Sequence, residues 1–301
     1  MKLQLETNTS KSRADKQFAF QAMPDLKRLQ ILTEADKQEV LSFLTVRPVH
    51  TVAMTSYIQD NGLENEANRG KFYGYRNASG TLEGVALIGH TTLVEARSDN
   101  SLMAFALAAR QSETPIHFMM SDGKAIETFW RYFTGDNRQP RRVCPELLFE
   151  LSFPLLVREC GWDVRLADAS ELEQIAVAHD ETAFIESGVS PLLKDREGFL
   201  KRCLRRIERK RTFVVFENGK LIFKADIVAE TSDVIYLEGI YVASEHRGKG
   251  IGSNCLSKLC LQLLERVENV CLLSNVEFKG AHRSFLKAGF KNTDSYQTIF
   301  V

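Results

Sequence analysis

The spacing of apolar and polar residues predicts the same order of strands and helices twice along the chain. Residues 28–44 show a short apolar run, a polar turn and then apolar residues at helical spacing, and residues 163–179 repeat this plan. Residues 71–97 predict a strand, a turn containing Asn and Gly, and two further strands, and residues 212–240 follow the same pattern. The chain is therefore predicted to consist of two halves that share one plan.

The elements that follow continue this plan. In the first half we expect a helix, a strand, a helix and a final strand or strand pair, at residues 100–111, 116–120, 123–133 and 142–153. In the second half we expect a helix, a strand, a helix and a C-terminal strand, at residues 253–267, 270–274, 280–290 and 295–300. Thr33 and Ser170 stand where N-caps are expected, because their hydroxyls accept hydrogen bonds from first-turn N–H groups.

The boundary between the halves is predicted near residues 152–162. A connection this short indicates packed domains rather than a flexible tether. We assign residues 1–22, which are polar, to a flexible N-terminus, residues 23–155 to a first domain and residues 160–301 to a second.

A glycine-rich run, RGKGIG, lies between a predicted strand at residues 234–242 and the helix that follows. It consists of Arg247, Gly248, Lys249, Gly250, Ile251 and Gly252. Glycines permit φ > 0 and a close approach of the backbone to an anion, and a helix N-terminus offers unpaired N–H groups. The run therefore predicts a phosphate cradle, and the alternative is a tight turn without a ligand.

The glycine spacing excludes the common nucleotide loops. A Walker loop requires GxxxxGK[ST], and a dinucleotide fingerprint requires GxGxxG, whereas the glycines at 248, 250 and 252 give GxGxG. The preceding strand also contains a Glu, unlike a fully buried parallel strand.

The segment from the strand through the loop resembles motif A of the GNAT superfamily of acyl-CoA N-acyltransferases. This resemblance implies that the loop binds the pyrophosphate of acetyl-CoA and that the backbone of Ile240, Tyr241 and Val242 binds the acyl carbonyl and the pantetheine arm. It implies an α/β fold with two GNAT-like mixed-sheet domains in tandem. The first half has no such loop after its fourth strand, so we expect it to be degenerate and to bind no coenzyme A.

Residues 280–290 resemble the family's motif B, with Ala281, Gly289 and Phe290 in register. Phe285 stands where the family has a tyrosine that protonates the leaving thiolate, and Phe278 stands where an asparagine is usual. Asn275 remains at the end of the preceding strand, and we count it and Phe285 among the cofactor-binding residues. Tyr296 and Tyr241 are candidate substitutes for the acid, or half-buried strand aromatics.

Glu238 is the candidate general base. It lies in the run YLEG, which is similar to the YLED segment of spermidine/spermine N-acetyltransferases, where the matching glutamate helps to deprotonate the amine. An alkylammonium has a pKa of about 10.4, so a carboxylate near the acceptor is chemically useful. The alternative is a carboxylate that only satisfies neighbouring donors.

The acceptor is expected to enter at a loop formed by residues 179–193. Asp180, Glu181 and Glu186 make this segment acidic, which suits a cationic amine, although a capped and solvated loop fits equally well.

Composition and charge bear on the partners, the location and the metal content of the protein. Of the 301 residues, 44% are hydrophobic and 26% charged, and Lys+Arg and Asp+Glu number 39 each, so nothing favours nucleic acid or an anionic membrane as a partner. The N-terminus lacks the apolar core of a signal peptide, and we expect a cytoplasmic protein. The six cysteines form no CxxC pair and predict buried thiols rather than metal ligands.

The sequence therefore predicts an enzyme that transfers an acetyl group from acetyl-CoA to a primary amine of a small molecule or peptide, in a ternary complex and without a metal. The main alternative is an acetyl-CoA-binding regulatory or scaffold protein with weakened catalysis, suggested by Phe285 and Phe278. A third reading, an aminoacyl transferase using charged tRNA, is disfavoured by the intact loop and the neutral charge. Homo-oligomerisation is left open.

Overall fold

The computed structural model describes residues 23–135, 137–154 and 159–301. The predicted flexible N-terminus at residues 1–22 lies outside the described residues, as do residues 155–158 of the predicted connection.

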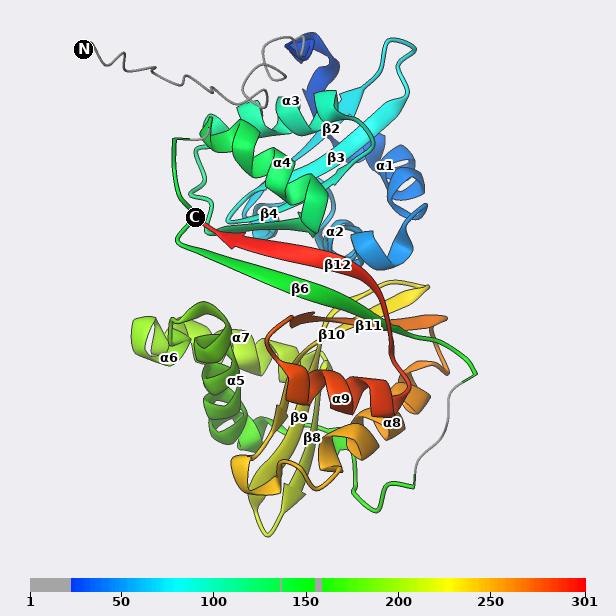
Figure 1. Cartoon of the computed structure of the whole chain (residues 1–301), viewed down its shortest axis with the longest axis vertical. Coiled ribbons are helices and arrows are strands. Elements are labelled where there is room, and N and C mark those ends of the chain that lie inside the picture. The colour runs from blue at the N-terminus through cyan, green and yellow to red at the C-terminus, as the bar shows by residue number, and fades with distance from the viewer. Residues whose placement is uncertain (1–22, 136, 155–158) are drawn as a thin grey trace, which may run out of the picture.

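The described residues form one continuous mixed sheet of 12 strands, in the order β1-β2-β3-β4-β5-β12-β6-β11-β10-β9-β8-β7 (Figure 1). The strands of the first half are β1 (Leu29–Ile31), β2 (Gly70–Arg76), β3 (Leu82–Gly89), β4 (Thr91–Ala96), β5 (Phe118–Asp122) and β6 (Arg142–Leu151). Those of the second half are β7 (Arg165–Leu166), β8 (Thr212–Glu217), β9 (Lys220–Glu230), β10 (Val234–Val242), β11 (Asn269–Asn275) and β12 (Lys291–Phe300). The predicted mixed α/β fold is confirmed.

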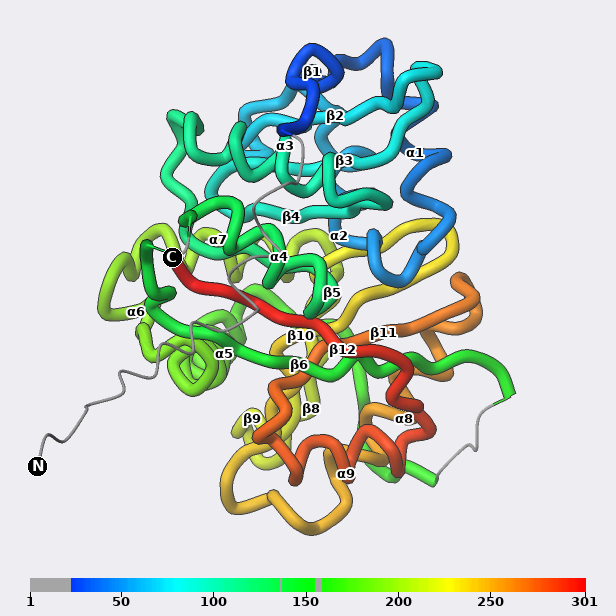
Figure 2. The backbone as a smooth tube through the Cα atoms, turned by 45° about the horizontal axis from the view of Figure 1, so that its top comes forward, coloured from blue at the N-terminus to red at the C-terminus, as the bar shows by residue number. Residues whose placement is uncertain are grey.

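The two halves exchange their last strands. β6 pairs antiparallel with β11, from Val270↔Leu151 to Asn275↔Glu146, and β12 pairs antiparallel with β5, from Tyr296↔Asp122 to Phe300↔Phe118. β6 and β12 also pair with each other, and they cross the middle of the molecule side by side (Figures 1 and 2). Each half of the sheet is therefore completed by a strand from the other half of the sequence.

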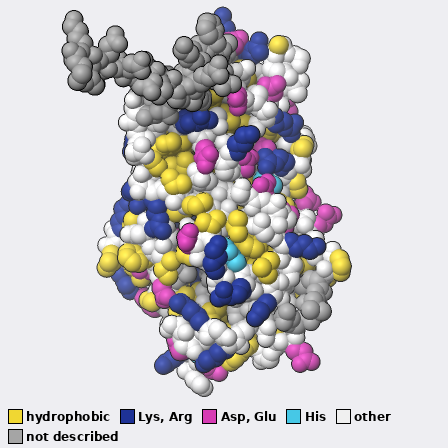
Figure 3. Space-filling model, viewed as in Figure 1, with side chains coloured by type: hydrophobic (Ala, Val, Ile, Leu, Met, Phe, Trp, Pro, Cys, Tyr) yellow, Lys and Arg dark blue, Asp and Glu magenta, His cyan; other side chains and the backbone are white. Residues whose placement is uncertain are grey.

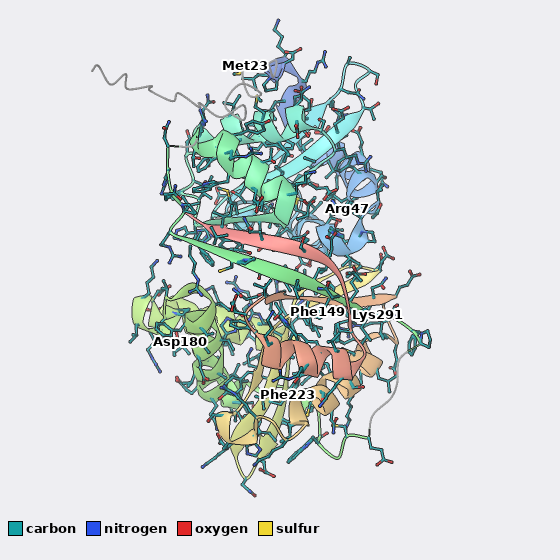
Figure 4. The ribbon with its side chains drawn as sticks, in the orientation of Figure 1. Met23, Arg47, Phe149, Asp180, Phe223 and Lys291 are labelled. Atoms are coloured by element: carbon teal, nitrogen blue, oxygen red, sulfur yellow. The ribbon has the colours of Figure 1, made fainter. Side chains whose placement is uncertain are left out.

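Helices cover both faces of this sheet. They are α1 (Lys37–Leu44), α2 (Pro48–Asn61), α3 (Asp99–Arg110), α4 (Gly123–Thr134), α5 (Leu172–Ser187), α6 (Pro191–Lys194), α7 (Arg196–Glu208), α8 (Ile251–Leu263) and α9 (Lys279–Ala288). α3 and α4 bury Phe105 and Phe129 against the first half, and α8 and α9 bury Leu256 and Phe285 against the second. Figure 4 shows Phe149 of β6 close to α9.

A shared core joins the halves. Val52 of α2 packs with Leu148 of β6 and with Tyr236 of β10, within one buried cluster. Across the same boundary, His50 lies 2.9 Å from Asp294. The prediction of packed rather than tethered halves agrees with these contacts.

Two local predictions were wrong. Asp168, not Ser170, caps the first turn of the second half, and its carboxylate accepts from the backbone N–H and hydroxyl of Ser170. The acceptor segment expected to be a loop is largely helical, because α5 continues to Ser187 and ends only at Gly188, whose φ of 73° is left-handed. Residues 172–187 contain no Gly or Pro, so the helix does not stop at the acidic residues.

All six cysteines are free thiols, and Cys160 alone among them is only partly buried. Within the described part of the chain, no group of His, Cys, Asp and Glu side chains has a geometry that could hold a metal ion. None of the helices described has the length and apolar character needed to cross a membrane.

Candidate active site

A cleft opens where β10 and β11 separate. These strands pair in parallel from Val234↔Asn269 to Leu237↔Leu272, and beyond this point they diverge. A cleft of about 860 Å³ lies between the diverging ends, lined by β10 from Tyr236 to Val242 and by β11 from Leu272 to Asn275. Separated strands leave backbone donors and acceptors without partners on that side, which is where ligands bind in open α/β sheets.

The predicted residues of β10 all reach this cleft. Glu238, Ile240, Tyr241 and Val242 line it, together with Gly239. Glu238 accepts a hydrogen bond of 2.6 Å from the hydroxyl of Tyr236. Burial and the charge of Glu238 raise the pKa of Tyr236 well above its ordinary value, so this tyrosine stays a donor to the carboxylate.

The glycine-rich loop lies at the same end of the strand, after the 3₁₀ turn η6 (Ser244–His246), and opens α8. Gly248 and Gly250 have φ of 76° and 83°, and open space surrounds the position of a Cβ at each. Among the described residues, no side chain caps α8 at Gly250, so its first-turn N–H groups remain available to an anion. A Cβ at Gly252 would lie 3.1 Å from Cγ2 of Val242, so the loop approaches the strand closely. These features fit a pyrophosphate cradle.

Of the two cations in the loop, Arg247 lines the described cleft wall and Lys249 does not. Arg247 donates from Nε to the carbonyl of Val242 at 2.9 Å and from a terminal nitrogen to Glu181 of α5, also at 2.9 Å. Its guanidinium therefore holds the loop against the strand and against α5, although Arg247 still lines the cleft. Gly248, Gly250, Ile251 and Gly252 line the described cleft wall, whereas Lys249 does not.

Helix α9 supplies cations that the sequence analysis missed. Arg283 and Lys287 are one turn apart and both line the cleft, with Ser284 between them. Figure 3 shows Lys and Arg side chains gathered over the part of this face where α9 lies. The i, i+4 spacing of the two cations was the available signal, because it places both on one side of a helix that follows β11.

The motif B positions contribute apolar surface and a polar strand end. Phe285 lines the cleft but is only 6% exposed, with its ring centroid 5.5 Å from that of Phe149 in an edge contact. Asn275 also lines the cleft, and its side chain accepts from the backbone N–H of Glu277 at 2.9 Å. Tyr296 cannot replace the missing tyrosine in this geometry, because it is buried and its hydroxyl donates to the carbonyl of His50 at 2.7 Å.

Four carboxylates line the cleft: Glu181, which pairs with Arg247, and Glu238, Glu186 of α5 and Glu146 of β6. Burial raises the pKa of Glu146 to about 7, and the charge of Glu238 adds to the rise. A hydrogen bond of 2.7 Å from the hydroxyl of Thr298 partly offsets this rise in pKa. Burial also raises the pKa of Glu186 to about 7, and the charges of Glu238 and Glu146 contribute. An opposite charge placed among these groups would favour their ionised forms.

Part of the acceptor side comes from the first half of the chain. Phe118, Met120, Cys144 and Glu146 of β5 and β6 line the cleft beside Thr298 and Phe300 of β12. No local pattern predicted these residues, because the strand exchange brings them there. Of the acidic residues predicted for the acceptor segment, Glu181 and Glu186 line the cleft, whereas Asp180 accepts hydrogen bonds from Ser190 and the backbone of Leu192.

Within the described residues, a side chain bridges the corresponding strands of the first half. β4 and β5 pair from Thr91↔Phe118 to Leu93↔Met120, and beyond that point Arg47 lies 3.2 Å from Glu95 and 3.4 Å from Asp122. Figure 4 shows Arg47 beside α2. The Arg47 side chain thus bridges the position that corresponds to the open cleft of the second half.

Comparisons with known proteins agree with this geometry. Residues 173–290, which include the loop and the two strands that border the cleft, β10 and β11, match the model of the acetyltransferase (GNAT) family. The second half therefore contains a GNAT domain, and the resemblance inferred from the loop is confirmed. No curated protein matches the chain in sequence.

Solved structures resemble the chain over nearly its whole length. A Drosophila protein is 12% identical, with a TM-score of 0.66, over 91% of this chain and 98% of that one. A tandem GNAT protein from the clavulanic acid biosynthesis pathway is 12% identical, with a TM-score of 0.55, over 90% of this chain and 97% of that one. A GNAT-family acetyltransferase from Colwellia psychrerythraea is 16% identical, with a TM-score of 0.54, over 91% and 99% of the two chains. At these identities the likeness establishes the fold alone. The family match supports acyl transfer, and the degenerate character of the first half stays a prediction.

Proposed function

We propose that this protein transfers an acetyl group from acetyl-CoA to a primary amine of a small molecule or peptide, by direct attack of the amine on the thioester. One observation carries the proposal: a single cleft joins an uncapped, glycine-lined helix N-terminus to a group of carboxylates, through the gap between β10 and β11. An anionic donor and a cationic acceptor would meet in that gap.

The acetyl-CoA donor would be held by backbone N–H groups and by cationic side chains. The first-turn N–H groups of α8 and the glycines at 248, 250 and 252 suit a pyrophosphate, and Arg283 and Lys287 add positive charge. The backbone from Ile240 to Val242 lines the adjoining wall, where a pantetheine arm and its thioester would lie. The bound donor supplies an activated acetyl group.

The acceptor side would deprotonate and orient the amine. An alkylammonium has a pKa of about 10.4 and must lose a proton before it attacks. Glu238 belongs to β10, the strand whose backbone lines the proposed thioester wall, and it also lines the cleft. The hydroxyl of Tyr236 fixes one oxygen of Glu238 and leaves the other for the amine or a bridging water. Glu146 and Glu186 would favour a positively charged acceptor, because a cation beside them relieves their mutual repulsion.

The departing thiolate has no tyrosine to protonate it at position 285. A thiol has a pKa of about 8.5, so its thiolate leaves without help, and a general acid adds roughly 10² to 10⁴ in rate. We therefore expect slow turnover. A cytoplasmic location and the absence of nucleic-acid, membrane and metal partners remain predictions.

The alternative function is acetyl-CoA binding with regulatory or scaffold output. Two observations favour it: Phe285 packs into the core without any donor, and Arg247 is engaged with Glu181. A panel of amines assayed for release of free thiol from acetyl-CoA, together with calorimetry of acetyl-CoA, separates the two functions. Tight binding with no transfer to any amine would favour the alternative.

A further inference from the structure

A lysine and an aspartate are buried side by side on β9, directly behind the cleft. Lys224 and Asp226 are each 1% exposed, and Nζ lies 2.5 Å from Oδ2. Burying an ammonium costs several kcal/mol unless its donors are satisfied, so this lysine requires an explanation. Its neighbours on β9, Phe223 and Ala225, are apolar and fully buried.

Asp226 has other partners besides this lysine. Arg206 of α7 donates to Oδ2 at 3.0 Å, and the hydroxyl of Thr212 donates to Oδ1 at 2.7 Å. Burial alone would raise the pKa of Asp226, but Lys224 and Arg206 outweigh it and hold that pKa well below its ordinary value. Arg206 and Thr212 would still pair with the carboxylate if Lys224 were absent, so pairing with Asp226 alone does not account for the lysine.

The second acceptor of Lys224 is the carbonyl of Gly239 on β10, at 3.1 Å. Gly239 lies in a β-bulge: Glu238 pairs with Asp226 and Tyr241 with Lys224, so Gly239 and Ile240 together face the single residue Ala225. Lys224 and Asp226 are thus the two β9 residues that bracket the bulge.

The bulge and the buried pair also fit each other sterically. Gly239 has φ of 57°, and a Cβ there would lie 2.8 Å from Nζ of Lys224 and 3.2 Å from Oδ2 of Asp226. The residues on either side, Glu238 and Ile240, both line the cleft. The backbone turn that the lysine holds is therefore the one from which the candidate base and the thioester wall project.

We infer that Lys224 is a positioning residue: its buried ammonium holds the carbonyl of Gly239, fixes the β10 bulge and so sets Glu238 and Ile240 toward the bound thioester. Without that donor the carbonyl is left unpaired, and the extra residue can shift along the strand. A shift of one residue turns side chains to the opposite face of a strand. Misplacement of a reacting group by about 1 Å costs on the order of 10²-fold in rate.

Three variants test this inference. Lys224→Met removes the donor and keeps the volume, Lys224→Gln keeps a shorter, neutral donor, and Thr212→Val removes a hydrogen bond from the same buried cluster without touching the bulge. Each is measured for kcat, for acetyl-CoA affinity by calorimetry, for unfolding, and for amide hydrogen exchange of residues 238–242.

Lys224→Met should lower kcat by roughly 10-fold to 100-fold with acetyl-CoA Kd changed by less than about threefold, and it should speed exchange of the bulge amides. Lys224→Gln should recover part of both effects, whereas Thr212→Val should lose stability only. Equal losses of kcat in Lys224→Met and Thr212→Val at equal stability would overturn the inference, as would unchanged bulge exchange in Lys224→Met. If Lys224→Met does not fold, Lys224→Gln and Gly239→Ala replace it, and unchanged bulge exchange in both overturns the inference.

The activity arm of this test rests on the proposed acetyl transfer, but the exchange arm does not. A wild-type protein that transfers no acetyl group would contradict the proposed function. Faster amide exchange of the bulge in Lys224→Met, but not in Thr212→Val, would still support the positioning role of Lys224.

Discussion

Replacing Glu146 by Gln should stabilise the protein at high pH and leave its stability nearly unchanged at low pH. Burial moves the pKa of this carboxyl from its ordinary 4.5 to about 7. A carboxyl whose pKa is raised in the folded state contributes no penalty well below pH 4.5; the penalty grows as pH rises from 4.5 to about 7 and is constant above that. Glutamine keeps the shape and can still accept from Thr298, but it cannot ionise.

The magnitude follows from the size of the pKa change. Each pKa unit corresponds to about 1.4 kcal/mol, which gives an upper limit of about 3 kcal/mol for ionising Glu146 above pH 8. Water in the cleft screens the charge, and Glu186 titrates with it, so we expect a gain of about 1–2 kcal/mol at pH 8.5 and almost none at pH 5. Urea unfolding of wild type and variant at both pH values measures the difference.

Glu150 offers a matched control on the same strand. It too accepts from a threonine hydroxyl, that of Thr293 at 2.6 Å, but it lies outside the described lining of the cleft. A gain of equal size and equal pH dependence in Glu150→Gln would refute the reasoning, because burial in the cleft would then not be its source. A Glu146→Gln gain that is the same at pH 5 and pH 8.5 would refute it as well.

Four further outcomes are expected. Gly250→Asp should abolish CoA binding, because it places a carboxylate in the proposed phosphate cradle. Unchanged CoA affinity in the folded variant, measured by calorimetry, would contradict the assignment of this loop as a phosphate site. Titration of the wild type should find one CoA per chain, since Arg47 bridges the corresponding opening of the first half, and two equivalent sites would contradict this. Glu238→Gln should lower kcat/KM by roughly 10² to 10⁴ with CoA affinity retained, and the wild-type kcat/KM should fall at low pH. Phe285→Tyr should speed thioester cleavage if protonation of the thiolate limits the rate; an unchanged rate in stopped-flow assays would place the limit at another step.

The donor side of the site was largely predictable from sequence because it is local. The loop at residues 247–252 and the strand before it are contiguous, and glycine spacing, β-branched residues and helical periodicity are all short-range signals. Glu238 was found for the same reason, as it lies nine residues before Arg247.

The acceptor side was not predictable, because it is assembled from distant segments. Glu146 reaches the cleft only through the pairing of β6 with β11, and no pattern near residue 146 indicates which strand lies beside it. The sequence did not indicate the role of Lys224 either. A lysine within an apolar strand predicts an exposed or edge position, whereas this lysine is buried with Asp226, which also pairs with Arg206 of α7.

The strand exchange also constrains the order in which the chain can fold. Thr298 and Glu146, which meet across β12 and β6, are 152 residues apart in the sequence. During synthesis β5 and β6 emerge early, whereas β12, which separates them in the sheet, is made only after β7–β11. The edge of β5 therefore stays unpaired until β12 has been made. Any direct pairing of β5 with β6 must be broken before β12 can insert between them. Loop closure over this span makes the insertion of β12 slow, so the sheet and the acceptor wall are completed only after β12 has been made.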